Sequence, residues 1–251
     1  MRPTRFVAWL IALLIAAPAQ SAVLAEAPCR ELSVAKANFA VCQFDPRRDD
    51  IRLYWKGADG KPYGGLAALA GALKAQGRAL RFAMNGGIFE ENLTPLGLYI
   101  EEGRTLRKLN LRAGTSNFYL KPNGVFYVGA GVAGIVETGR FAVAPPPAHY
   151  ATQSGPMMLV EGRINGNIEP TGTSVKIRNG VGVRADGQVI FAISDSAVTF
   201  HDFALLFRDH LDCPDALYLD GSVSQLYAPN LTRADALAPL GPIIGVSSPA
   251  P

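Results

Sequence analysis

The second half of the chain contains the stretch Val181-Gly-Val-Arg-Ala-Asp-Gly-Gln-Val-Ile-Phe-Ala-Ile193, in which two apolar runs flank Asp186-Gly187. A glycine-containing turn between two apolar runs is typical of a β-hairpin. The same pattern recurs in residues 98–106, 118–128 and 158–164. We therefore expect a strand-rich domain with many hairpins.

Two main helices are expected beside these strands. Leu66, Leu69 and Leu73 recur at helical spacing, and Gly77 is a natural stop. A second helix should begin at Thr199, because Thr-x-x-Asp is a capping pattern and apolar residues follow at helical spacing.

Further strands are expected at residues 51–55, 80–84 and 216–219, and residues 145–147 (Pro-Pro-Pro) indicate a surface loop or an internal boundary. The Ala- and Pro-rich tail from 234 to 251 is expected to cross the surface. The prediction is a single α+β domain over residues 26–251, with a mixed or antiparallel sheet.

Composition excludes several classes of protein. Of the 251 residues 49% are hydrophobic, and 24 Lys and Arg nearly balance 21 Asp and Glu. A disordered chain would have fewer apolar residues, and a nucleic-acid-binding groove would need a larger basic excess. We expect no nucleic-acid partner.

Residues 1–25 are typical of a secretory signal peptide. Arg2 and Arg5 precede the apolar residues 6–17, and cleavage after Ala25 fits the small residues before it. The apolar run is shorter than the roughly 20 residues of a membrane span, so no stable membrane insertion is expected after cleavage. The predicted location is periplasmic or secreted.

Three cysteines permit one disulfide bond in an oxidising compartment. Cys29 with Cys42 would close a short hairpin-sized loop, whereas Cys42 with Cys213 would join the two ends of the domain. The sequence leaves both pairings open.

Four motifs combine a strand end, glycine and a polar side chain, which is where a ligand can approach the backbone closely. They are Asn85-Gly86-Gly87, Gln153-Ser154-Gly155-Pro156, Arg178-Asn-Gly-Val-Gly182 and Asp220-Gly221-Ser222. Each pattern alone also occurs in ordinary turns. Asp220 follows a buried apolar strand directly and is therefore the best-marked acid.

The order of these motifs, together with Gly97-Leu-Tyr-Ile100 and Asn117-Phe118, resembles the phosphodiester glycosidase family, which includes the mammalian lysosomal uncovering enzyme. The resemblance runs from about residue 29 to residue 245. It implies hydrolysis of the sugar–phosphate bond of a sugar-1-phosphodiester such as an N-acetylglucosamine-1-phosphodiester. Ser222 and Pro156 depart from residues common in the family, which concerns substrate identity more than reaction class.

The resemblance also implies roles for the motif residues. Asp220 would be the base or nucleophile, Arg178 would hold the phosphate through a bidentate contact, and Asn85 would orient sugar hydroxyls or phosphate oxygens. Glu90 is a candidate second carboxylate. The expected substrate-binding residues are Gly86, Gly87, Ser154, Gly155, Gly221 and Ser222.

Two other readings stay open at this point. The same pocket could bind an envelope glycan or phosphoglycan without cleaving it. Asn85, Asp195 and Asp220 could instead supply oxygen ligands to calcium or magnesium, although no local loop spacing supports such a site. The expectation is an enzyme with a small-molecule or polymeric phosphoglycan substrate, no metal and no cofactor.

Overall fold

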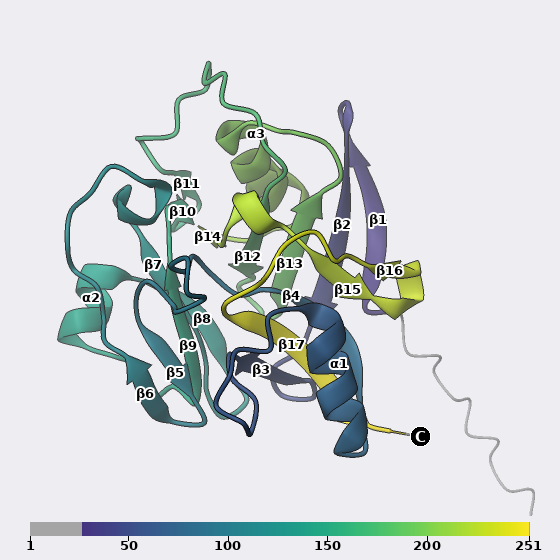
Figure 1. Cartoon of the computed structure of the whole chain (residues 1–251). Coiled ribbons are helices and arrows are strands. Elements are labelled where there is room, and N and C mark those ends of the chain that lie inside the picture. Colours follow the sequence, from purple (N-terminus) through teal and green to yellow (C-terminus); the bar gives the residue numbers. More distant parts are fainter. Residues whose placement is uncertain (1–26, 251) are drawn as a thin grey trace, which may run out of the picture.

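The computed structural model describes residues 27–250, so the predicted signal peptide at 1–25 lies outside the described residues. Three sheets, all with antiparallel pairing, are arranged around a shared core (Figure 1). The predicted α+β class is therefore confirmed.

The strands of each sheet come from distant parts of the chain. The seven-stranded sheet has the order β1 (Cys29–Val34), β2 (Ala37–Phe44), β13 (Val189–Ser194), β12 (Asn179–Val183), β14 (Asp215–Tyr218), β10 (Met157–Val160) and β11 (Arg163–Ile164). The second sheet has the order β16 (Arg233–Ala234), β15 (Leu226–Ala228), β4 (Arg78–Asn85), β17 (Ile243–Pro249) and β3 (Asp50–Tyr54). The third has the order β6 (Arg104–Arg107), β5 (Tyr99–Glu101), β9 (Tyr150–Ser154), β7 (Gly124–Val128) and β8 (Ala133–Glu137).

Four phenylalanines join the three sheets at the centre. Phe191 of the seven-stranded sheet lies 4.8 Å from Phe82 of the second sheet and 6.0 Å from Phe126 of the third, measured between ring centroids. Phe44 lies 5.1 Å from Phe82. These rings are nearly inaccessible to solvent, so the sheets stabilise one another through a common aromatic core.

Each sheet has a helix on its outer face. Leu66, Leu69 and Leu73 of α1 (Leu66–Ala75) pack on the second sheet, and Phe141 of α2 (Thr138–Val143) packs on the third. The helix α3 (Phe200–Leu205), which continues as one π-helical turn to His210, covers the seven-stranded sheet. The two expected helices are confirmed, and the Thr199 side chain accepts a hydrogen bond from the Asp202 N–H as the capping pattern predicts.

Three of the four predicted hairpins are confirmed, namely β5–β6, β10–β11 and β12–β13. The hairpin expected over residues 118–128 is wrong. Asn117–Tyr119 forms a 3₁₀ turn, Pro122 offers no N–H to a ladder, and the Asn123 side chain donates to the Phe118 carbonyl at 2.7 Å. The strand β7 therefore begins at Gly124 and pairs with β8 and β9.

The expectation of a surface tail over residues 234–251 is wrong for residues 240–249, whereas residues 234–239 are largely accessible. Residues 243–249 form β17, which lies between β4 and β3 in the second sheet. Ile243, Ile244 and Val246 are fully buried there, so this short apolar run outweighs the proline-rich composition around it. The six-residue helix α2 was not expected, because it is too short to show helical periodicity; its start is held by the Glu137 side chain, which accepts from the Arg140 N–H.

The disulfide bond joins Cys29 to Cys42, which face each other across the β1–β2 pair. Cys213 is a free, buried thiol, and burial raises its pKa to about 12. Of the two pairings that the sequence allowed, the structure contains the short one.

Within residues 27–250, no helix has both the length and the apolar character that crossing a membrane would require.

Candidate functional site

Strand ends from all three sheets meet around Asp220. The strand β14 ends two residues before it, and β12 starts beside it, because Gly180 of β12 pairs with Tyr218 of β14. Asn85 ends β4 in the second sheet, and Ser154 ends β9 in the third. Hydrogen bonds connect these ends, so the structure brings residues of all four predicted motifs together at the backbone of residues 219 and 220.

Two fully buried asparagines hold the backbone of Asp220 from both sides. Asn85 Nδ2 donates to the Asp220 carbonyl at 2.9 Å, and the Asp220 N–H donates to Asn179 Oδ1 at 3.0 Å. Asn179 Nδ2 in turn donates to Asn85 Oδ1 at 2.6 Å, and the Gln225 N–H donates to the same oxygen at 3.1 Å. Both amide side chains are thus occupied by protein groups, and their effect is to fix where Asp220 sits.

Ser154 of the motif at residues 153–156 supports the same segment, residues 219–220, from the third sheet. Ser154 is fully buried, and its Oγ donates to the Leu219 carbonyl at 2.7 Å. Gly155 has no room for a side chain, because an added Cβ would lie 2.7 Å from Asn123 Cβ. The structure therefore uses Ser154 to hold the carbonyl that precedes Asp220, whereas Gly155 packs against Asn123 and Phe118.

The backbone of Gly86 and Gly87 packs closely against β9. The Thr152 hydroxyl donates to the Gly86 carbonyl at 2.8 Å. Gly87 has a φ of 140°, and a Cβ there would lie 2.8 Å from Thr152 Oγ1, so only glycine fits without displacement.

Asp220 is the partly exposed acid of the site. Its carboxylate accepts from the Ser222 N–H at 3.0 Å, which starts the 3₁₀ turn Gly221–Val223. Burial raises the pKa of Asp220, and the hydrogen bond from Ser222 offsets part of that effect. Ser222 itself is exposed, so the Asp220–Ser222 turn is where the site meets solvent.

Arg178 lies inside the protein beside this turn. Its side chain is only 1% exposed; Nε donates to the Val198 carbonyl at 2.9 Å and Nη2 to the Ser174 carbonyl at 2.8 Å. The guanidinium carbon lies 3.5 Å from the Phe200 ring centroid, and burial lowers the Arg178 pKa. Two of the five N–H groups of the guanidinium, on Nε and Nη2, are thus used on backbone carbonyls, and little of the side chain is accessible for the bidentate phosphate contact expected from the sequence.

Tyr218 links Arg178 to the Asp220 turn. The Gly221 N–H donates to the Tyr218 hydroxyl at 2.5 Å, and the Tyr218 ring centroid lies 5.8 Å from the guanidinium carbon. Sequence reasoning missed the roles of Tyr218 and Asn179, although both lie inside motifs that it singled out. Their composition gave no signal, because Tyr218 is indistinguishable from a core strand residue and Asn179 from a strand-end polar residue.

Two other candidate acids are paired with arginines elsewhere. Glu90 lies 3.7 Å from Arg107 on an accessible loop, and the exposed Asp195 pairs with Arg233 at 2.5 Å. Among the residues that the structure describes, no three His, Cys, Asp or Glu side chains are grouped to hold a metal ion. Asn85, the third ligand of the possible metal site, is occupied as described above.

Comparison with known proteins identifies a family and a fold. A family model described as phosphodiester glycosidase matches residues 78–246. The Escherichia coli protein named "Uncharacterized protein YigE" is 42% identical over 183 residues, which are 73% of this chain and 71% of that protein.

Two solved structures share the fold. The catalytic domain of zebrafish N-acetylglucosamine-1-phosphodiester alpha-N-acetylglucosaminidase, described as auto-inhibited by its pro-peptide, aligns with a TM-score of 0.61 and 16% identity over 87% of this chain and 81% of that one. A putative exported protein of Burkholderia pseudomallei aligns with a TM-score of 0.51 and 12% identity over 86% of this chain and 74% of that one.

Proposed function

Because the chain belongs to the phosphodiester glycosidase family, we propose that it hydrolyses the bond between sugar and phosphate in a sugar-1-phosphodiester. The observation that carries the proposal is the convergence of three sheets on Asp220, an acid with a raised pKa at an accessible turn. Rigid support of one ionisable group is the arrangement that a catalytic carboxylate needs.

One carboxylate is sufficient for this reaction class. Most glycosidases use two carboxyl groups, one of which protonates a poor alcohol leaving group. A phosphate monoester leaves as a stable anion, so the acid is dispensable. Asp220 would act either as the base that takes a proton from water, whose oxygen then bonds to the anomeric carbon, or as the nucleophile itself. Both routes break the bond from the anomeric carbon to the phosphate oxygen and release a phosphate monoester. The first yields the free sugar directly, whereas the second leaves the sugar as an ester on Asp220, which a water molecule then hydrolyses to free sugar and the regenerated carboxylate.

The buried polar residues would act on the position of Asp220. Asn85, Asn179 and Ser154 fix the backbone from residue 219 to residue 220, and this assigns Asn85 a positioning role in place of direct sugar contact. Arg178 would act in the same way, through Tyr218 and the turn at Gly221.

The groups left to contact substrate lie at the Asp220–Ser222 turn and beside Gly87. They are the Asp220 carboxylate, the Ser222 hydroxyl and the backbone of Gly87, because the N–H groups of Gly86 and Gly221 already donate to the Pro242 carbonyl and the Tyr218 hydroxyl. We place the sugar and phosphate oxygens beside these groups, where the Ser222 hydroxyl can donate a hydrogen bond to one of them.

The proposed substrate is an N-acetylglucosamine-1-phosphodiester or a polymeric phosphoglycan with the same linkage. Support comes from the fold shared with the zebrafish catalytic domain, whose name gives that activity. The proposed location is periplasmic or secreted, supported by the sequence of residues 1–25 and by the Cys29–Cys42 disulfide. N-terminal sequencing of the periplasmic fraction tests it; a start at residue 1 in the cytoplasm would contradict it.

The test of activity compares the protein with its Asp220→Asn variant on a panel of sugar-1-phosphodiesters. Asparagine retains an acceptor for the Ser222 N–H, and the backbone bonds of residue 220 do not involve the carboxylate, so the fold should be preserved. We expect kcat/KM to fall by about 10²–10⁴-fold. Asp59→Asn, a substitution at an exposed turn acid, is the matched control and should leave turnover unchanged.

Two outcomes would overturn the proposal. Equal turnover by Asp220→Asn would remove Asp220 from the chemistry. Glycan binding without release of sugar from any diester, unaffected by the substitution, would indicate a non-catalytic phosphoglycan-binding protein.

A further inference from the structure

A cavity of about 630 Å³ lies at the end of the seven-stranded sheet opposite Asp220. At this end Val183 pairs with Val189, and Val189 pairs with Phe44, whereas Asn179 pairs with Ile193 at the Asp220 end. The volume is in the range of small-molecule sites. Nothing proposed for Asp220 uses this cavity.

Arginines dominate the charge of the cavity. Its charged lining consists of Arg30, Arg48, Arg81, Arg184, Asp45 and Asp49, with His210 at one side. Val41, Ile190 and Leu211 give it an apolar wall, and the amides of Gln43 and Gln188 add neutral polar groups.

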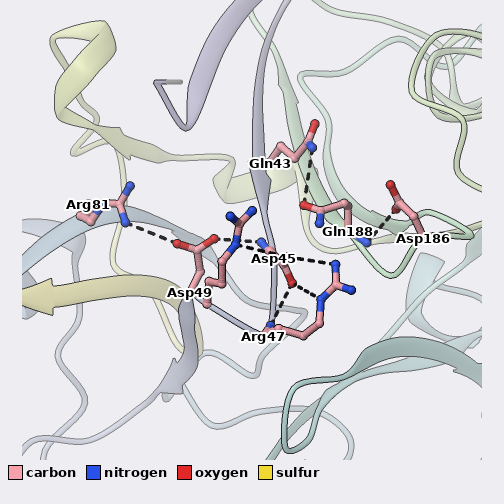
Figure 2. A network of polar contacts seen from close by, with 8 residues as sticks. Gln43, Asp45, Arg47, Asp49, Arg81, Asp186 and Gln188 are labelled. Carbon is pink, nitrogen blue, oxygen red and sulfur yellow. Dashed lines mark hydrogen bonds and ion pairs between the residues drawn. The ribbon is translucent and has the colours of Figure 1, made fainter. Parts of the chain in front are cut away.

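One of the two lining carboxylates is already neutralised from outside the cavity. Asp45, only 5% exposed, accepts from Arg47 Nε at 2.8 Å and from Arg47 Nη2 at 3.0 Å, as Figure 2 shows. These bonds hold the pKa of Asp45 below its usual range, so it stays ionised and bound to Arg47. Arg48 is left with a longer contact of 3.4 Å to the same carboxylate. Arg47 thus folds back onto Asp45 and covers it.

The carboxylates of the lining only partly compensate the charge of the remaining arginines. Arg81 lies 3.4 Å from Asp49 (Figure 2), and Arg184 contacts the largely exposed Asp212 at 3.0 Å. Arg30 has no carboxylate within ion-pair distance among residues 27–250. The cavity therefore presents several guanidinium groups whose charge is not balanced by its own lining.

We propose that this cavity is a second binding site, for a soluble ligand with two or more phosphate groups on a saccharide. Guanidinium groups bind phosphate oxygens through paired hydrogen bonds. Saccharide hydroxyl groups would find amide partners in Gln43 and Gln188. The site is independent of turnover at Asp220, so it can exist whether or not the protein is a hydrolase.

Calorimetry with glucose 1,6-bisphosphate as the probe tests the proposal at low and at physiological salt. Arg30→Gln and Arg184→Gln remove lining charge at partly or fully accessible positions, and each should weaken binding by about tenfold. Arg163→Gln is the matched control, because Arg163 is exposed on β11, at the other edge of the sheet from Arg30, and should bind the probe like the wild type. Thermal unfolding of all three variants checks that the fold is retained.

The result that supports the site is weakened binding in both cavity variants, with Arg163→Gln and Asp220→Asn unchanged. Loss of binding in Asp220→Asn alone would place the probe in the candidate active site and overturn the proposal. Equal affinity in all variants, or absence of binding by the wild type, would also overturn it. Capture by phosphatidylglycerol vesicles without binding of the soluble probe would show a membrane surface as the partner and would contradict a saccharide ligand.

Discussion

Replacing Asn85 by alanine should destabilise the protein strongly, because this buried amide satisfies three polar groups at once. Its Nδ2 donates to the Asp220 carbonyl at 2.9 Å, and its Oδ1 accepts from Asn179 Nδ2 at 2.6 Å and from the Gln225 N–H at 3.1 Å. Alanine would leave each of those groups buried without a partner, at a cost of about 1–3 kcal/mol apiece. We expect a loss of about 3–6 kcal/mol in the free energy of unfolding, the lower part of the summed range, because a water molecule in the vacated space restores part of the bonding.

Urea unfolding measures this loss, with the slope against denaturant serving as a check that the unfolding reaction is unchanged. The control is Asn92→Ala, which removes one exposed contact, with the Thr94 N–H, and should cost no more than about 1 kcal/mol. If the two variants were equally stable, the Asn85 network would not hold the site together.

An Asn85→Asp variant tests the contribution of the Nδ2 donor alone, because aspartate has nearly the same size and shape as asparagine. It keeps the acceptors but places a carboxyl group against the Asp220 carbonyl, where burial raises its pKa. The folded state then binds the proton more tightly than the unfolded state, so the stability of the variant should fall as pH rises through that raised pKa. A pH-independent difference from the wild type would contradict this account.

Three further predictions concern the core, the cysteines and the acid. Phe191→Ala should lower the free energy of unfolding by about 3–5 kcal/mol, since its ring contacts rings of the other two sheets; a loss below about 1 kcal/mol in urea unfolding would contradict this. Removing the disulfide by Cys29→Ser with Cys42→Ser should lower the free energy of unfolding by about 3 kcal/mol, because the bond closes a loop with a sequence separation of 13; an unchanged Tm would argue against this. The buried Cys213 thiol, with its pKa raised to about 12, should react with iodoacetamide only after unfolding. The raised pKa of Asp220 should place the acid limb of kcat/KM above the 3.8 of an ordinary aspartate, since activity is lost as the carboxylate is protonated; a limb at or below that value would count against its role.

Local patterns were sufficient to predict most elements of the fold. The turn at Asp186-Gly187 and the capping residues Thr199 and Asp202 are short-range signals, and each lies where the pattern indicated. The strand β17 could not be predicted in the same way. Its apolar run is short and follows prolines, and its place in the sheet depends on pairing with β3 and β4, which lie some 160 or more residues earlier in the chain.

The candidate site was predictable as a set of motifs but not as a set of contacts. Asn85, Ser154 and Asp220 do converge, yet the sequence could not distinguish a side chain that faces a ligand from one that faces the backbone of its neighbour. That distinction depends on the direction of each side chain at its strand end, which pairing between distant strands determines.

Arg178 and Asp45 are both buried, and one reason accounts for both. Each is a charged residue whose polar atoms are satisfied locally: Arg178 by two carbonyls and a stacked ring, and Asp45 by the two nitrogens of Arg47. A buried charge is tolerated when such partners exist, and then it serves as a fixed support and not as a contact for ligands. Because the buried polar side chains around Asp220 are occupied in this way, the Asp220 carboxylate and a few neighbouring groups are left to contact a substrate. Substitution of the supporting residues should therefore lower stability and kcat together, whereas substitution of Asp220 should lower kcat alone.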